Sequence, residues 1–291
     1  MPSKNIVIAP CGNKAYLFKE SWLKQKQEKQ FDLCLLFYHE KINVPERYSE
    51  VDFFFHLKGY KFHMIYELLT KIHPEWLETY DYFYFLDDDI EIDTRQINAM
   101  FAFSRAFGIW ISQASLTADS FCSWPMFKRK SNSFCRYVGQ IEVMSPLFSS
   151  YGLKKCMETF ISNQSSWGID SVWSKLLGYP KDRLIVFGAV IKRHTLPVGV
   201  GELYQKLGIS PKEEWFMVTD KYDAKRHNYQ EYGRLQLVNK KNNRFRFFLY
   251  KCGEFFATLK QNWRDYGFMS RVKSRKNKLL KKGKLKSDSV L

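Results

Sequence analysis

Residues Tyr80–Asp93 read YDYFYFLDDDIEID, an aromatic and apolar run that ends in three consecutive carboxylates. The β-prone residues Tyr82–Leu86 are typical of a strand that is buried on both faces, as in a parallel or mixed sheet covered by helices. Burying three adjacent carboxylates without partners would be too costly, so we expect Asp87–Asp89 at the carboxyl end of this strand, open to water or holding a cation. The stretch therefore predicts an α/β fold with a candidate site where one central strand ends.

The acidic triplet also predicts which side chains act together. Side chains alternate along an extended chain, so Asp87 and Asp89 should point to one side and Asp88 to the other. Two carboxylates on one side suit a magnesium or manganese ion that also holds the phosphates of a substrate. The alternative is an acidic turn after a core strand, without any ligand.

Six blocks of sequence between residues 55 and 199, taken in order, resemble a known family. They are FHLKGYKFHMIYELL, YDYFYFLDDDIEID, ISQASLTADSF, IEVMSPLF, SSWGIDSVWSKLLG and FGAVIKRHTLPVG. The acidic block is similar to the Asp-x-Asp motif of GT-A glycosyltransferases, which use a metal ion to bind the diphosphate of a nucleotide sugar. More narrowly, the set resembles a bacterial and plant family defined only as domain of unknown function number 707, which is grouped with that fold.

This resemblance implies a GT-A-like, Rossmann-like mixed central sheet flanked by helices. It also implies a metal-dependent enzyme that transfers a sugar from a nucleotide-sugar donor to a saccharide or lipid-linked acceptor, with Mn²⁺ or Mg²⁺ as cofactor. Asp87 and Asp89 would hold the metal ion, and Asp88 would help to bind the donor. Bacterial surface polysaccharide or lipopolysaccharide synthesis is the expected pathway.

The N-terminal segment predicts a strand, a helix and a second strand at residues 5–10, 14–30 and 31–38. That order indicates a right-handed crossover and a parallel sheet, with ligands bound beyond the strand ends. In the enzymes that the chain resembles, the first loop holds the nucleotide base, and a generic strand-to-helix turn is the alternative here. The residues expected to contact the base are Ala9, Pro10 and Cys11.

Two lysines open the next expected helix, which runs to about Ile72. Free backbone N–H groups at a helix N-terminus attract anions, and neighbouring lysines add direct charge. Lys58 and Lys61 are therefore candidate ligands of the donor diphosphate. Two solvated lysines are the alternative.

Residues 163–178, NQSSWGIDSVWSKLLG, carry a second chemical signal. Asp170 is expected at the start of a helix, where an Asp is also a favoured cap. It resembles the acid after Trp-Gly in many GT-A enzymes, which would make it the base that deprotonates the acceptor hydroxyl. A single base of this kind fits direct displacement with inversion at the anomeric carbon, and retention stays open.

A strand expected at residues 183–191 is followed by three basic side chains. By the same resemblance, His194 would be the third protein ligand of the metal ion, a role that imidazole can fill for manganese. Lys192 would face the donor phosphates and compensate the charge that builds on a departing diphosphate. The more common alternative for a lone histidine is a structural role.

Glu142 is a further candidate, in a strand expected at residues 134–144. It could contact the substrate, or it could be a structural acid paired with a base such as Arg136. In a strand, its side chain would share a face with that of Met144.

Composition bounds the partners of this 291-residue chain, which has a net charge of +16 and a pI near 9.4. Such a balance favours anionic partners, and with 17% aromatic residues some rings should line a groove or touch a membrane. Two rival classes stay open: a metal-dependent nuclease or phosphotransferase, and a basic nucleic-acid-binding protein. Nucleic acid is the less favoured partner, because the catalytic signals lie outside the basic tail.

Three regions are expected along the chain: a catalytic domain at 1–204, a helical or irregular extension at 205–269 and a basic tail at 270–291. Residues 271–286 carry nine basic side chains and no acidic one. With the rings that precede them, they suit the anionic surface of a membrane. Six cysteines without metal-binding spacing and the lack of a long apolar run predict a cytoplasmic protein, peripheral at the inner face of the cytoplasmic membrane.

Overall fold

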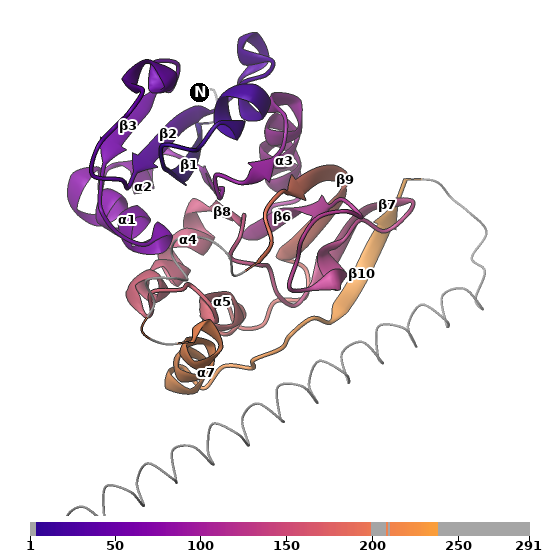
Figure 1. Cartoon of the computed structure of the whole chain (residues 1–291). Helices are drawn as coiled ribbons and strands as arrows, with labels where there is room; N and C mark the ends of the chain where they lie inside the picture. Colours follow the sequence, from indigo (N-terminus) through magenta and orange to yellow (C-terminus); the bar gives the residue numbers. More distant parts are fainter. Residues whose placement is uncertain (1–3, 199–207, 209, 238–291) are drawn as a thin grey trace, which may run out of the picture. The chain divides into compact units, whose positions relative to one another are not determined.

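The computed structural model describes residues 4–198, 208 and 210–237, which form a mixed sheet with helices on both faces (Figure 1). The sheet order is β10-β7-β9-β6-β8-β4-β1-β2-β3, and the short β5 pairs with β9. The strands are β1 (Asn5–Cys11), β2 (Asp32–Phe37), β3 (Phe53–His56), β4 (Tyr82–Phe85), β5 (Ile90–Glu91), β6 (Ile111–Leu116), β7 (Ser133–Val138), β8 (Leu147–Ser149), β9 (Leu184–His194) and β10 (Glu231–Gln236).

The helices connect these strands and cover the sheet. The α-helices are α1 (Lys61–Glu67), α2 (Trp76–Thr79), α3 (Thr94–Ala106), α4 (Ser150–Cys156), α5 (Ile169–Leu176) and α7 (Pro211–Lys221). The shorter 3-10 and π turns are η1 (Phe18–Trp22), η2 (Lys26–Glu28), η3 (Pro45–Tyr48), η4 (Leu68–Ile72), η5 (Pro125–Phe127) and η6 (Met157–Ile161). None of the helices that the structure describes has the length and apolar character needed to span a bilayer.

The sheet combines parallel and antiparallel pairs. Strand β1 pairs in parallel with β2 and β4, β2 with β3, and β6 with β9. Strand β8 runs antiparallel between β4 and β6, and β7 and β10 extend the sheet in antiparallel fashion beyond β9. The expected α/β class, with a mixed central sheet flanked by helices, is confirmed.

The central strand β4 is buried on both faces, as the sequence predicts. Tyr84 packs edge-on against Phe101 of α3, with ring centroids 6.1 Å apart. On the opposite face, the ring of Phe85 contacts those of Phe62 in α1 and Phe160 in η6. Because side chains alternate along the strand, its carboxyl end emerges between these two layers of helices.

Two segments differ from the sequence-based expectation. Residues 14–30 form the short turns η1 and η2 rather than one amphipathic helix. The strand expected at 134–144 ends at Val138, so Glu142 lies in the loop between β7 and β8. In both places the chain is held by long-range contacts, such as the bond from the Trp22 indole N–H to the Ile90 carbonyl (2.6 Å), which local sequence patterns do not show.

The first compact unit of the chain spans Met1–Val238. It therefore includes α7 and β10, which the sequence analysis placed in an extension after residue 204. Strand β10 pairs with β7, and α7 packs against α5, at the bottom of Figure 1. The rest of the expected extension and the basic tail lie outside the described residues.

Candidate active site

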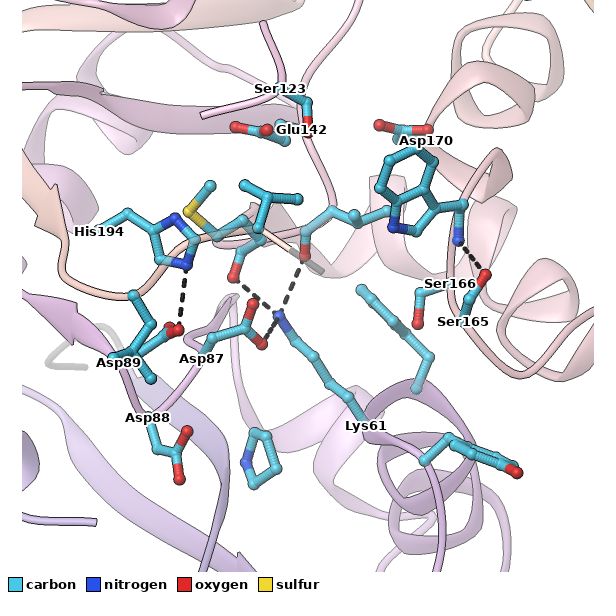
Figure 2. Close-up of a pocket in the computed structure, with 18 of the residues that line it drawn as sticks. Lys61, Asp87, Asp88, Asp89, Ser123, Glu142, Ser165, Ser166, Asp170 and His194 are labelled. Carbon is cyan, nitrogen blue, oxygen red and sulfur yellow. Dashed lines mark hydrogen bonds and ion pairs between the residues drawn. The ribbon is translucent and has the colours of Figure 1, made fainter. Parts of the chain in front are cut away.

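The acidic triplet lies in the turn after β4, where it opens into a cavity of about 570 Å³ (Figure 2). All three of its carboxylates line this cavity. The turn is held by β5, whose Ile90 pairs with His194 at the end of β9. It ends at a capping box, in which the Asp93 carboxylate accepts from the Gln96 backbone N–H (2.8 Å) and so begins α3. Local capping and strand pairing thus place the triplet.

Asp87 is paired with Lys61, the first residue of α1. The Lys61 Nζ lies 2.7 Å from Asp87 Oδ1 and also donates to the carbonyls of Val143 (3.0 Å) and Met144 (2.8 Å). These contacts use all three hydrogens of the ammonium group. Burial raises the pKa of Asp87, and the charge of Lys61 opposes that rise. Lys61 therefore ties the acidic turn to the loop that follows β7.

Asp89 faces His194, with Nε2 of the ring 3.0 Å from Asp89 Oδ2. The other ring nitrogen, Nδ1, lies 2.9 Å from the Phe121 carbonyl, so it carries a proton and donates. Burial lowers the pKa of His194, but the hydrogen bond and charge of Asp89 raise it more, so the balance is upward. The second oxygen of Asp89, Oδ1, is buried and has no hydrogen-bond partner among the described residues.

Asp88 points toward the N-terminal wall of the cavity. Burial and the charges of its two acidic neighbours raise its pKa to about 7, while the backbone N–H of Gly12 lowers it. The wall beside it is formed by β1, the loop after it and residues that follow β2. Pro10 lines the cavity there, whereas Ala9 and Cys11 are buried strand residues that do not.

Asp170 lies at the opposite end of the same cavity, in the first turn of α5 (Figure 2). The helix starts after Gly168, which has a φ of +94° and packs so closely on α7 that a Cβ there would lie 2.6 Å from Trp215 Cδ1. Asp170 is 6% exposed, and its Oδ1 accepts from the Ser171 N–H (2.8 Å). Burial, with the charge of Glu142, raises the pKa of Asp170 to about 7.

Glu142 is a second buried carboxylate in this cavity, and it is not paired with Arg136. The Arg136 guanidinium donates to the Met126 carbonyl (2.8 Å) and lies 4.0 Å from Glu231. Burial raises the pKa of Glu142 to about 7, against the charges of Lys192 and other cations. Its Oε2 is buried without a hydrogen-bond partner among the described residues.

Two lysines predicted to bind phosphates lie away from the cavity lining. Lys58 is exposed and pairs with Glu40 (2.7 Å). Lys192 is buried beneath the site, where its ammonium group donates a hydrogen bond to the Ser145 hydroxyl. Burial lowers the pKa of Lys192 to about 8, although Glu142 opposes this. Among the described basic residues, Lys14 does line the cavity, and the sequence analysis did not single it out.

The walls of the cavity are rich in aromatic rings, which the sequence analysis expected as a class but did not place. The rings of the N-terminal wall are those of Tyr16, Tyr38 and His39, and the start of α1 adds those of Tyr60 and Phe62. The rings of the Asp170 wall are those of Trp124, Trp167, Trp215 and Tyr229. Apart from Trp167, which belongs to the Trp-Gly pair before Asp170, their only signal in the sequence is the high aromatic content, because strands and loops far apart in the chain bring them together.

The carboxylates of the acidic turn offer oxygen ligands to a divalent ion, but the protein does not supply a complete set of ligands. The unpaired Asp89 Oδ1 is a free hard ligand, and a His that donates Nδ1–H to a carbonyl is oriented as metal-binding histidines are. However, no group of three His, Cys, Asp or Glu side chains within 4–198, 208 and 210–237 is arranged to hold a metal. The described residues thus offer only part of a metal shell, and a bound ion would need further ligands from another molecule.

Comparison with known proteins found no family model and no curated protein that matches the chain. Among solved structures, it is similar to a fragment of TarS from S. aureus in complex with UDP-GlcNAc, with 13% identity, a TM-score of 0.47, and coverage of 75% of this chain and 65% of that one. The same fragment with UDP gives 12% identity, a TM-score of 0.43 and coverage of 75% and 70%. For a protein from STIV, the identity is 14%, the TM-score is 0.38, and the match covers 66% of this chain and 86% of that one. The chain spans less than two thirds of the length of the TarS fragment with UDP-GlcNAc. The resemblance to family 707 stays a prediction.

Proposed function

We propose that this chain is a glycosyltransferase that moves a sugar from a nucleotide-sugar donor to an acceptor hydroxyl. The observation that carries the proposal is that an acidic strand end and a remote buried carboxylate, Asp170, line one cavity of about 570 Å³. A cavity of this size suits a small ligand rather than a nucleic-acid duplex. Carboxylates at one end favour a metal-bound diphosphate, and a buried carboxylate at the other favours proton removal.

The donor would lie along the N-terminal wall, with its diphosphate at the acidic turn. Asp87 and Asp89 would hold a Mn²⁺ or Mg²⁺ ion together with the diphosphate oxygens, and His194 would join them through Nε2. When bound, such an ion supplies positive charge that stabilises a departing diphosphate. Lys14 lines the cavity and offers a further cation, while Asp88 and Pro10 line the wall for the nucleoside.

Asp170 would act as the base at the other end of the cavity. Its carboxylate takes the proton of the acceptor hydroxyl while the hydroxyl oxygen forms a bond to the anomeric carbon. The bond from that carbon to the diphosphate oxygen breaks, and the diphosphate leaves with the electron pair. A single displacement of this kind inverts the anomeric configuration. A pKa of about 7 suits the task, because the group then accepts protons readily near neutral pH.

The wider setting of the reaction is also a proposal. The six sequence blocks support membership in the GT-A-like family described above and, through it, a role in bacterial surface polysaccharide or lipopolysaccharide assembly. The nine basic residues of 271–286 support a location at the inner face of the cytoplasmic membrane, where lipid-linked acceptors are made.

A thermal-shift screen with nucleotide diphosphates and nucleotide sugars, each with and without manganese, tests the proposal. A ligand that binds only the folded state raises its apparent stability, so the correct donor should raise the melting temperature more with manganese than without it. If no nucleotide or nucleotide sugar stabilises the protein, and the protein cleaves DNA or RNA in a metal-dependent way, the nuclease class would be favoured instead.

A further inference from the structure

We infer that Glu142, Asp170 and Trp124 form an acceptor subsite for an uncharged sugar ring that donates hydroxyl hydrogens to both carboxylates. The inference rests on the proposed function, because it names the acceptor of that same transfer. The inference goes beyond the proposed function in two ways. It assigns Glu142 a role in acceptor binding, and it excludes acceptors that carry a phosphate or carboxylate beside the reacting hydroxyl.

Glu142 is placed for a ligand rather than for the fold. Its side chain lines the cavity, the residue is only 5% exposed, and its Oε2 has no hydrogen-bond partner in the described part of the chain. Its backbone N–H donates to the Gln113 side-chain oxygen (2.8 Å), which fixes the loop that carries it. A buried carboxylate oxygen left unpaired costs free energy, and a hydroxyl donor from a ligand would remove that cost.

Asp170 provides the second acceptor of hydrogen bonds. The two carboxylates are close enough for the charge of Glu142 to raise the pKa of Asp170, and Figure 2 shows both on the side of the cavity away from Asp88. A carboxylate accepts hydrogen bonds and cannot donate them when ionised. A ring with several hydroxyl groups can satisfy both side chains. Above pH 7, where both carboxylates are ionised, a second anion next to them would be repelled.

Trp124 gives this end of the cavity a rigid apolar wall. Its ring is half-buried and packs on Tyr229 with centroids 4.7 Å apart, and the ring of Trp215 lies 5.7 Å away from it. Such a supported indole offers a flat surface to the C–H face of a sugar ring while the ring hydroxyls reach the carboxylates. An apolar lipid chain would use the wall but leave both carboxylates without partners, so the structure favours a sugar ring.

The test measures how far acceptor probes stimulate release of nucleotide diphosphate from a donor found in the thermal-shift screen. The probes are a panel of neutral methyl hexosides and the same hexosides carrying a 6-phosphate. A neutral hexoside should stimulate the wild-type protein, with a KM at least tenfold lower than that of its phosphorylated counterpart. Glu142→Gln should raise the KM of the neutral probe by about 10- to 100-fold and narrow its advantage over the phosphorylated probe.

Two further variants guard against misfolding. Trp124→Ala should raise the KM of the neutral hexoside, and Trp110→Ala, a similarly half-buried ring outside the cavity, should not. A melting-temperature shift with nucleotide diphosphate shows that each variant retains its donor half. The inference is overturned if a donor binds but no neutral hexoside stimulates the protein, if phosphorylated probes work equally well, or if Glu142→Gln keeps the wild-type KM values. Absence of any donor binding would instead reject the proposed function.

Discussion

Replacing Asp170 by Asn separates the catalytic role of this carboxylate from its role at the start of α5. The side chain keeps its size but loses the ability to take a proton, so transfer should fall by about two to four orders of magnitude while donor binding survives. The pH profile should change as well. In the wild-type protein kcat/KM should rise with pH and level off above about pH 7, because the pKa of Asp170 is raised to about 7, and the variant should lack this rise.

The same substitution should change stability with a sign that depends on pH. Burial moves the pKa of Asp170 from 3.8 to about 7, so between these values unfolding releases a proton and the free energy of unfolding falls as pH rises. The full effect above pH 7 is about 4 kcal/mol. Asn carries no charge but turns an N–H toward groups that donate to Asp170, such as the Ser171 N–H, at a cost of about 1–3 kcal/mol. The variant should therefore be more stable than wild type at pH 8 by about 1–3 kcal/mol, and less stable at pH 4.

Urea denaturation at pH 4 and pH 8, together with initial rates across the same range, measures both effects. Wild-type turnover in Asp170→Asn would assign this carboxylate to helix capping alone. A stability difference that does not vary with pH would show that Asp170 is ionised throughout, and the account of its burial would be wrong.

Three more perturbations address the acidic turn and the tail. Asp89→Asn should weaken binding of nucleotide diphosphate in the presence of manganese by at least about tenfold by calorimetry, and unchanged affinity would remove Asp89 from the metal site. Lys61→Met removes the cation beside the half-buried Asp87 and the donor to the Val143 and Met144 carbonyls, so it should cost about 1–3 kcal/mol in urea unfolding, whereas Lys58→Met, in an exposed pair, should cost less than about 1 kcal/mol; equal losses would contradict this. Truncation after residue 270 should release the protein from anionic vesicles at low salt and spare turnover of a soluble acceptor, and full-length protein that ignores such vesicles would refute the membrane role.

The strands near the acidic turn were predictable because their signal is local. The apolar run at Tyr82–Leu86 predicts a buried strand, and the three acidic residues after it must then lie at the end of that strand. The capping box that begins α3 at Asp93 is equally local, because its two partners stand three residues apart in the chain. These elements depend on residues that are neighbours in the chain, so the pattern of polar and apolar residues is enough to place them.

The rest of the fold and of the candidate site depends on contacts between segments that are far apart in the sequence. The position of Lys61 at the start of a helix predicts a ligand of the donor diphosphate, and that role stays a prediction. Nothing near Lys61 in the sequence indicates that its ammonium group also donates to two carbonyls of the loop after β7. Likewise, the charged and aromatic residues after 204 predict a helical or irregular extension, and nothing local in them indicates the edge strand β10. The burial of Trp215 and the partners of β10 become visible only in the folded sheet.

The packing of Trp215 on Gly168 has a consequence for how the protein is made. The donor half is complete once His194 at the end of β9 has left the ribosome, and at roughly 5–20 residues per second Trp215 of α7 follows roughly 1–4 s later. During that time the start of α5 lacks the helix that closes over it, since the Gly168 backbone and the Trp215 ring are in direct contact in the folded chain. Translation thus sets an order of assembly in which the half that we assign to the donor is complete first, and the wall that we assign to the acceptor is finished only as the last strand of the sheet is added.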